Sequence, residues 1–173
     1  MQAGARHISF GGPDFLNAPT HTLGVARALH ARHPGVTWDA TIKIEHVLAH
    51  RALFAGLSSL GCLFIVSAVE SLSDLVLEKL RKDHTGADVR AARGVLRAVG
   101  IVLRPTWIAF TPWTTAADYP QMLDFIQDAD LTNALDPVQL AVRLLIPPHS
   151  AILEVADGVP WLLPLDDASL SYA

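Results

Sequence analysis

The stretch Gly61-Cys-Leu-Phe-Ile-Val-Ser-Ala-Val-Glu-Ser71 decides the fold of this chain. Its run from residue 62 to residue 66 is apolar without interruption, which is typical of a strand buried on both faces in a parallel sheet covered by helices. Polar residues return at Ser67, Glu70 and Ser71. Glu70 is therefore expected at the carboxyl end of a buried strand, where α/β sheets and barrels bind their ligands.

Strand-like and helix-like segments alternate through the rest of the chain. Further strands are predicted at residues 7–10, 36–44, 101–110 and 138–146, and helices at 20–32, 45–60, 72–80, 85–100 and 119–129. Two helices begin with the spacing of an N-cap and its third-residue partner, namely Ser71 with Asp74 and Thr85 with Asp88. Five strands that alternate with helices predict a parallel α/β domain over residues 1–150, followed by a C-terminal extension over 151–173.

The bulk composition is that of one globular domain with a substantial core. Of the 173 residues, 51% are hydrophobic and 17% are charged, and the formal net charge is −4. Basic residues form no block, so nothing indicates nucleic acid as a partner. The first residues lack the apolar region of a signal peptide and no apolar run has transmembrane length, which predicts a cytoplasmic protein without a membrane partner. A single cysteine excludes an intrachain disulfide and any metal site built from several cysteines.

Two short features close to predicted strand ends are candidates for ligand contact. The loop Gly11-Gly12-Pro13-Asp14 follows the first strand, and glycine there would let the backbone lie close to a ligand, although an ordinary strand-to-helix turn explains the same residues. The loop has no Gly-x-Gly-x-x-Gly or Walker pattern, so it does not predict a nucleotide phosphate loop. Lys43 lies near the end of the second strand, where it could hold an anionic group or simply face solvent.

A third feature has the spacing of a metal site. His46 and His50 are four residues apart on one predicted helix, with Glu45 beside them, and this spacing can clamp a metal ion. A zinc protease requires glutamate directly after the first histidine, and Val47 occupies that position. Two exposed histidines on a helix flank are therefore the favoured interpretation, and a metal-dependent hydrolase is a distant alternative.

Three segments carry a pattern that extends over about residues 6 to 150. They are His7-Ile-Ser-Phe-Gly-Gly-Pro-Asp-Phe-Leu-Asn17, Ser67-Ala-Val-Glu-Ser71 and Leu103-Arg-Pro-Thr-Trp-Ile-Ala-Phe-Thr-Pro-Trp-Thr-Thr115. Together they resemble the barrel domain of radical S-adenosylmethionine (SAM) enzymes. The resemblance implies a partial TIM-type (βα) barrel with about five parallel strands and outer helices, corresponding to strands two to six of the six in that family.

The resemblance also implies a cofactor site. Gly11, Gly12 and Pro13 match the loop that meets the amino group of SAM, with Asp14 as the only nearby carboxylate. Glu70 matches a position that would accept hydrogen bonds from the ribose hydroxyls or the amino group, since carboxylates suit such donors. The complete set of candidate SAM-binding residues is Gly11, Gly12, Pro13, Asp14, Lys43, Ser67, Glu70 and Ser71.

The chain departs from the family at the iron–sulfur cluster. Radical SAM enzymes hold a [4Fe–4S] cluster through three cysteines in a Cys-x3-Cys-x2-Cys loop, whereas Cys62 is the single cysteine here and is expected to be a small core residue. The resemblance therefore implies SAM as a cofactor, and the cluster only if a missing N-terminal unit is supplied.

The resemblance, together with the missing cluster cysteines, leaves two possible functions for this chain. The first is the C-terminal part of an enzyme that would cleave SAM to a 5′-deoxyadenosyl radical, truncated by a misplaced start or as a relic and inactive alone. The second is a non-catalytic α/β domain that binds a partner or a small ligand. The incomplete barrel is expected to leave the first strand, at residues 7–10, as an exposed edge that favours self-association, strand donation by another chain, or aggregation.

Overall fold

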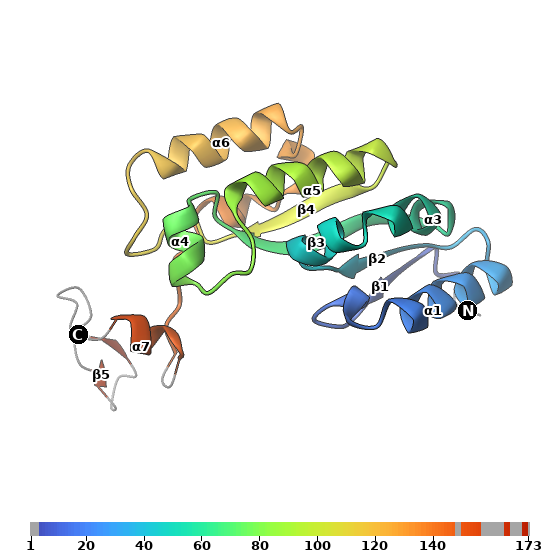
Figure 1. The fold of residues 1–173 in the computed structure, drawn as a ribbon, viewed down its shortest axis with the longest axis horizontal. Helices are drawn as coiled ribbons and strands as arrows, with labels where there is room; N and C mark the ends of the chain where they lie inside the picture. Colours follow the sequence, from blue (N-terminus) through green and yellow to red (C-terminus); the bar gives the residue numbers. More distant parts are fainter. Residues whose placement is uncertain (1–3, 148–149, 157–164, 167–170, 173) are drawn as a thin grey trace.

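A computed structural model describes residues 4–147, 150–156, 165–166 and 171–172. Its core is a sheet of four parallel strands in the order β1-β2-β3-β4 (Figure 1). The strands are β1 (His7–Phe10), β2 (Thr37–Thr41), β3 (Cys62–Glu70) and β4 (Val102–Trp107). The order and direction of these strands confirm the α/β class and the partial-barrel arrangement, with β1 at one edge.

Helices connect the strands in the expected alternation. They are η1 (Phe15–Asn17), α1 (Pro19–Arg32), α2 (Ile44–Ala49), η2 (Arg51–Leu53), α3 (Phe54–Ser59), α4 (Asp74–Lys79), α5 (Gly86–Ala98), α6 (Asp118–Asp128), η3 (Thr132–Ala134), η4 (Pro137–Leu140) and α7 (Ile152–Ala156). A short antiparallel pair, β5 (Leu165–Asp166) and β6 (Ser171–Tyr172), lies in the predicted extension. No helix in these ranges is long and apolar enough to cross a bilayer.

The predicted single helix over residues 45–60 is wrong. It is divided into α2, η2 and α3, because the backbone leaves the helical region at His50, with φ −112° and ψ 25°. Val47 on α2 and Phe54 on α3 are both fully buried in the core.

The two faces of the sheet differ in burial. Side chains that point toward the helices, such as Trp38, Ile65 and Leu103, are almost completely buried. On the opposite face of β3, Phe64 and Val66 are only half-buried and Ala68 is exposed. The expectation that β3 is buried on both faces is therefore wrong, because helices such as α3 and α5 cover one face and leave the other open (Figure 1).

The fifth strand predicted at residues 138–146 is also wrong. Pro137–Leu140 forms the 3₁₀ helix η4, which Asp136 caps by accepting a hydrogen bond from the backbone N–H of Val138 at 3.2 Å. The segment still runs beside β4, but the side chain of Gln139 replaces backbone pairing by accepting from the N–H of Trp107 at 2.9 Å. Within the described residues, parallel pairing here is limited to one bridge between Phe110 and Arg143.

The two predicted helix caps have different outcomes. Thr85 and Asp88 form a complete capping box at the start of α5, and the hydrogen bonds from Thr85 lower the pKa of the Asp88 carboxyl. The predicted pair of Ser71 and Asp74 is wrong, because α4 begins one residue after Ser73. Asp74 instead accepts a hydrogen bond from the backbone N–H of Gly86 at 2.8 Å, which joins the starts of α4 and α5.

Candidate functional site

The carboxyl ends of β1, β2 and β3 meet at one mouth. A cavity of about 280 Å³ lies between the loops that follow these strands and the loop between α4 and α5. It is lined by Pro13, Thr41, Ile42, Lys43, Ile44, Glu45, Ala68, Leu80, Arg81, Lys82, Asp83 and His84. Two residues of the predicted cofactor set, Pro13 and Lys43, thus share this cavity with charged residues of both signs.

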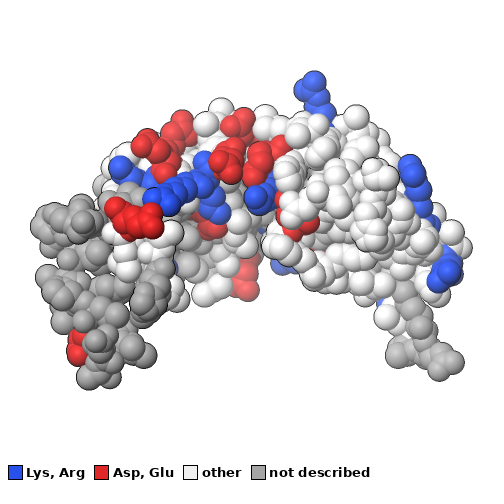
Figure 2. Space-filling view, turned by 60° about the horizontal axis from the view of Figure 1, so that its bottom comes forward, with Lys and Arg blue, Asp and Glu red and all other residues white. Residues whose placement is uncertain are grey.

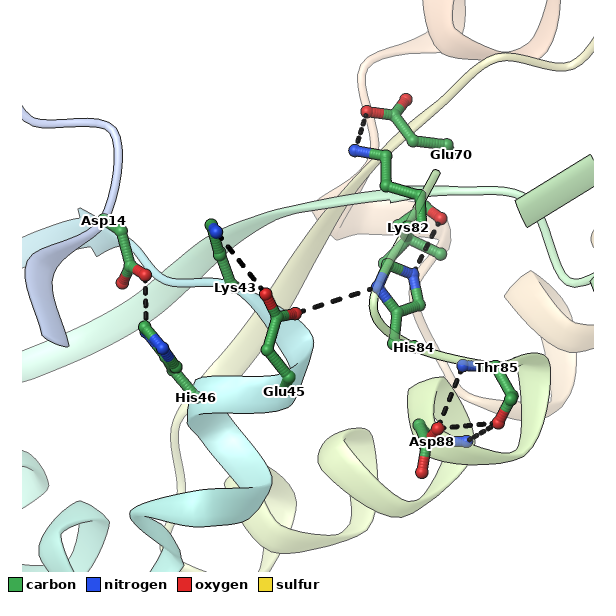
Figure 3. Close-up of polar contacts among 10 residues, drawn as sticks. Asp14, Lys43, Glu45, His46, Glu70, Lys82, His84, Thr85 and Asp88 are labelled. Atoms are coloured by element: carbon green, nitrogen blue, oxygen red, sulfur yellow. Dashed lines mark hydrogen bonds and ion pairs between the residues drawn. The ribbon is translucent and has the colours of Figure 1, made fainter. Parts of the chain in front are cut away.

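Glu70 ends β3 in a strained conformation. Its φ is +64°, in the left-handed region, and the backbone N–H of Ser71 donates to the carbonyl of Val69 at 2.8 Å. Positive φ with a hydrogen bond between residues two apart is the pattern of a γ-turn, which is rare for a residue other than glycine. The Glu70 carboxylate then accepts an ion-paired hydrogen bond from Lys82 Nζ at 3.0 Å (Figure 3). Backbone strain of this kind costs about 1–3 kcal/mol and often marks functional sites.

The glycine loop after β1 is open to solvent. Neither Gly11 nor Gly12 has a positive φ, and a Cβ atom built on either would meet no atom within 4 Å. Conformation and packing in the described structure therefore do not require glycine at these two positions. Asp14 follows the loop and is buried, with 7% of its surface exposed.

Asp14 connects the glycine loop to helix α2. Its Oδ1 accepts a hydrogen bond from the backbone N–H of Leu16 at 3.1 Å and caps η1. Its Oδ2 lies 2.5 Å from His46 Nδ1, but neither of these buried atoms has a hydrogen bond of good alignment in the described structure. The pair is thus a close electrostatic contact with unused hydrogen-bonding capacity.

A second polar group lines the cavity itself. Lys43 Nζ is 3.6 Å from Glu45 Oε1, and Glu45 Oε2 is 3.9 Å from His84 Nδ1 (Figure 3). His84 is buried, and its Nε2 contacts the carbonyl of Val69 at 3.2 Å. Sequence analysis missed His84, because Lys82-Asp83-His84 reads only as a polar break between two helices.

The two predicted serines do not line the cavity. Ser67 lies on the helix-covered face of β3, is fully buried, and its hydroxyl has no hydrogen-bond partner in the part of the chain that the structure describes. Ser71 Oγ accepts a hydrogen bond from the backbone N–H of Ser73 at 3.1 Å. The structure therefore gives Ser71 a local role in the turn and separates Ser67 from the mouth.

His46 on α2 and His50, which directly follows α2, have no third potential metal ligand among the described residues. The rings of His46 and His50 lie 5.8 Å apart, and His46 faces Asp14 rather than solvent. Among the described residues, no group of three or more His, Cys, Asp or Glu side chains could hold a metal ion.

A polar cluster on the open face of the sheet was missed by sequence analysis. Asp39 is buried and accepts hydrogen bonds from Ser9 Oγ at 2.5 Å and from His7 Nε2 at 2.8 Å. The ring of Phe64 lies between the His7 ring, 5.6 Å away, and the Arg104 guanidinium, 4.8 Å away. These contacts join β1, β2, β3 and β4 across the open face. The alternation of polar and apolar residues in His-Ile-Ser-Phe and Thr-Trp-Asp-Ala was the available signal.

Charges of both signs are mixed on the surface. Figure 2 shows acidic and basic side chains interspersed on the viewed face rather than gathered into one basic patch.

Cys62 is expected to be chemically inert in the folded protein. Burial, and to a smaller degree the negative charge of Asp39, raise the pKa of its thiol from 9.0 to about 12. Because the thiolate is the reactive form, native protein at pH 8 should react with iodoacetamide far more slowly than protein unfolded in guanidinium. Mass spectrometry would measure the alkylation of Cys62, and equal rates in native and unfolded protein would contradict the burial of this thiol.

The raised thiol pKa also makes stability depend on pH. Since the pKa of Cys62 is higher in the folded state, the contribution of the buried thiol to the free energy of unfolding should be complete below pH 9 and decline as the pH rises from 9 towards 12.

Solved structures share this fold. The cobalamin-dependent S-adenosylmethionine radical enzyme OxsB aligns over 70% of this chain and 19% of its own, with a TM-score of 0.61 and 19% identity. The radical S-adenosylmethionine methyltransferase TsrM of Kitasatospora setae aligns over 72% and 26%, with a TM-score of 0.60 and 14% identity. Elp3 of the archaeon Methanocaldococcus infernus aligns over 87% and 40%, with a TM-score of 0.59 and 12% identity. No protein-family model and no curated protein sequence matches the chain.

The comparisons confirm the resemblance at the level of the fold. This chain spans about a fifth to two fifths of the length of these structures. The four parallel strands and their helices are thus the partial-barrel architecture seen in radical SAM enzymes.

Proposed function

We propose that this chain is the C-terminal part of a radical SAM domain and forms a scaffold that binds S-adenosylmethionine. The observation that carries the proposal is the convergence of three strand ends, which bring Pro13 and Lys43 to one cavity beside the Glu70–Lys82 pair. The partial coverage of OxsB, TsrM and Elp3 supports a fragment of a larger assembly. The alternative function is that of a non-catalytic α/β domain that binds a partner or a small ligand, and it would use the same scaffold.

The residues present suit SAM. Gly11 and Gly12 have open space where a side chain would lie, so a ligand can approach their backbone closely. The carboxylates of Asp14 and Glu70 match the ammonium and hydroxyl donors of SAM, and Asp14 Oδ2 is buried without a well-aligned hydrogen bond among the described residues. When bound, SAM supplies the sulfonium chemistry of the family, and this chain would orient it and exclude water.

The residues do not suit the [4Fe–4S] cluster. Three thiolates are needed and the sequence has one cysteine, Cys62, which is buried in the sheet and has a thiol pKa of about 12. No reductive step is therefore assigned to this chain. In this proposal the chain does not turn over by itself, and the cluster is held by a separate polypeptide unit.

Replacing Glu70 by alanine should weaken SAM binding by about 1.5–3 kcal/mol, the cost of losing a charged hydrogen bond, which is about 10- to 150-fold in affinity. Titration calorimetry of the wild type and Glu70→Ala with SAM would measure the difference. Glu78→Ala is the matched control, because Glu78 is an exposed glutamate on α4. Equal affinities of the wild type and Glu70→Ala would remove Glu70 from the site, and absence of wild-type binding would remove the proposed function.

A second candidate function is self-association through β1. This strand is an edge of the sheet, and beside it lies a mainly apolar groove of about 390 Å³. The groove is lined by Ile8, Phe10, Val25, Ala28, Leu29, Arg32 and His33. A second copy presents the same edge and groove, so two chains could pair their β1 strands about a two-fold axis.

Ala28→Glu should abolish such a dimer, because it places a charge in the apolar groove without altering the core. Ala28 is exposed on α1, so the monomer should remain folded. Light scattering coupled to size exclusion would give the mass in solution. Arg27→Glu, at the neighbouring exposed position, should leave the mass unchanged. A monomeric wild type would rule out self-association.

A further inference from the structure

The γ-turn at Glu70 is held from outside by a buried histidine. The carbonyl of Val69 accepts two hydrogen bonds, one from the backbone N–H of Ser71 at 2.8 Å and one from His84 Nε2 at 3.2 Å. A carbonyl oxygen can only accept, so the Nε2 of His84 carries the proton in this contact. The hydrogen bond that closes the turn therefore shares its acceptor with a side chain from the loop between α4 and α5.

The same loop also holds the Glu70 side chain. Arg81, with φ +51°, follows the C-terminus of α4, and the N–H groups of Arg81 and Lys82 donate to the carbonyls of Glu78 and Leu77, both at 2.9 Å. These two bonds form a Schellman motif, which fixes where the Lys82 side chain begins. Lys82 Nζ then lies 3.0 Å from Glu70 Oε1. Both the backbone and the carboxylate of Glu70 are thus fixed by residues 81–84.

We propose that His84 is a positioning residue for Glu70: by donating to the Val69 carbonyl, it stabilises the left-handed turn that aims the Glu70 carboxylate at the ligand. A non-glycine residue in this conformation relaxes unless its surroundings hold it. His84 is well suited to hold it, because only 3% of its side chain is exposed and it has little freedom to move. The Nδ1 atom faces Glu45 at 3.9 Å, beyond hydrogen-bond distance, so the contact with Val69 is the directed one. The consequence for SAM rests on the proposed function, whereas the consequence for the turn does not.

The test compares His84→Ala with His84→Gln. Glutamine can place an amide N–H near the position of Nε2, so it should restore the hydrogen bond to Val69, whereas alanine removes it. The first readout is hydrogen exchange of the Ser71 amide, measured by NMR, with the Leu96 amide in the core as an internal reference for global stability. The second readout is the affinity for SAM by calorimetry.

We expect the Ser71 amide of His84→Ala to exchange about tenfold faster relative to Leu96, and SAM affinity to fall by about tenfold, since one lost hydrogen bond is worth about that factor. His84→Gln should restore both values. If Ser71 and Leu96 change in parallel, or if glutamine fails to rescue, His84 has a general structural role and the proposal is overturned. If the exchange pattern is as expected but the wild type does not bind SAM, His84 holds the turn and the proposed function fails instead.

Discussion

Trp38→Ala is expected to lower the free energy of unfolding by about 3–5 kcal/mol. Trp38 has no exposed surface and points from β2 toward the helices. Its ring packs against Phe10 at 5.3 Å and Phe15 at 5.2 Å between ring centroids, and its Nε1 donates to the carbonyl of Leu60 at 2.9 Å. Urea unfolding followed by circular dichroism would give the change.

A matched pair of substitutions separates the hydrogen bond of Trp38 from its packing. Trp107 is also buried, with 1% exposed, but its Nε1 has no hydrogen-bond partner within the described structure. Trp38→Phe should therefore cost about 1 kcal/mol more than Trp107→Phe, because only the first leaves the Leu60 carbonyl without a partner. Equal losses would indicate that the bond of Trp38 to Leu60 contributes nothing to stability.

The four strands of the sheet could be predicted because each is a short segment with apolar, β-branched or aromatic residues that is followed by a helix. β1 was predicted with its observed bounds, and the predictions for β2, β3 and β4 overlap the observed strands. The exposure of one sheet face could not be predicted in the same way. Phe64 and Val66 are apolar in sequence, and their partial exposure follows from the absence of a covering layer in the described structure.

The segment of the wrongly predicted fifth strand is preceded by a competing local signal. Residues 138–146 are rich in Val and Leu and favour a strand, but Asp136-Pro137 directly before them favours a turn or a helix start. Proline has no N–H and leaves one pairing position empty, and Gln139 supplies a side-chain acceptor to β4 in place of a backbone carbonyl.

The candidate site was predictable where its residues follow strand ends. The position of Glu70 at the end of β3, and of Lys43 just after β2, could be predicted in this way. The roles of His84 and Asp39 could not, because they depend on contacts with Val69, and with His7 and Ser9, that are distant in sequence. A sequence pattern indicates which residues lie at a sheet edge, but it does not indicate which loop folds back over them.

Gly86→Ala is expected to destabilise the protein by about 1–3 kcal/mol or more, as overpacking does in a closely packed interior. Gly86 is buried at the first position of α5. A Cβ atom there would lie far inside the contact distance of the Leu72 carbonyl oxygen, which is backbone and cannot rotate away. Its N–H is also held by Asp74 Oδ1 at 2.8 Å, so the helix start cannot shift without losing that bond.

Gly94→Ala is the matched control in the same helix, and its effect should have the opposite sign. Gly94 is exposed, and a Cβ atom there meets nothing within 4 Å, so alanine should stabilise α5 by about 0.5–1 kcal/mol. Urea unfolding of both variants would measure the difference in the free energy of unfolding.

The contact of Gly86 with Leu72 also joins the two segments that carry Glu70 and His84. Leu72 follows the Glu70 turn by two residues, and Gly86 follows His84 by two. Gly86→Ala should therefore also speed hydrogen exchange of the Ser71 amide, whereas Gly94→Ala should not. A stable Gly86→Ala variant with unchanged exchange at Ser71 would mean that these two segments are not fixed by this contact.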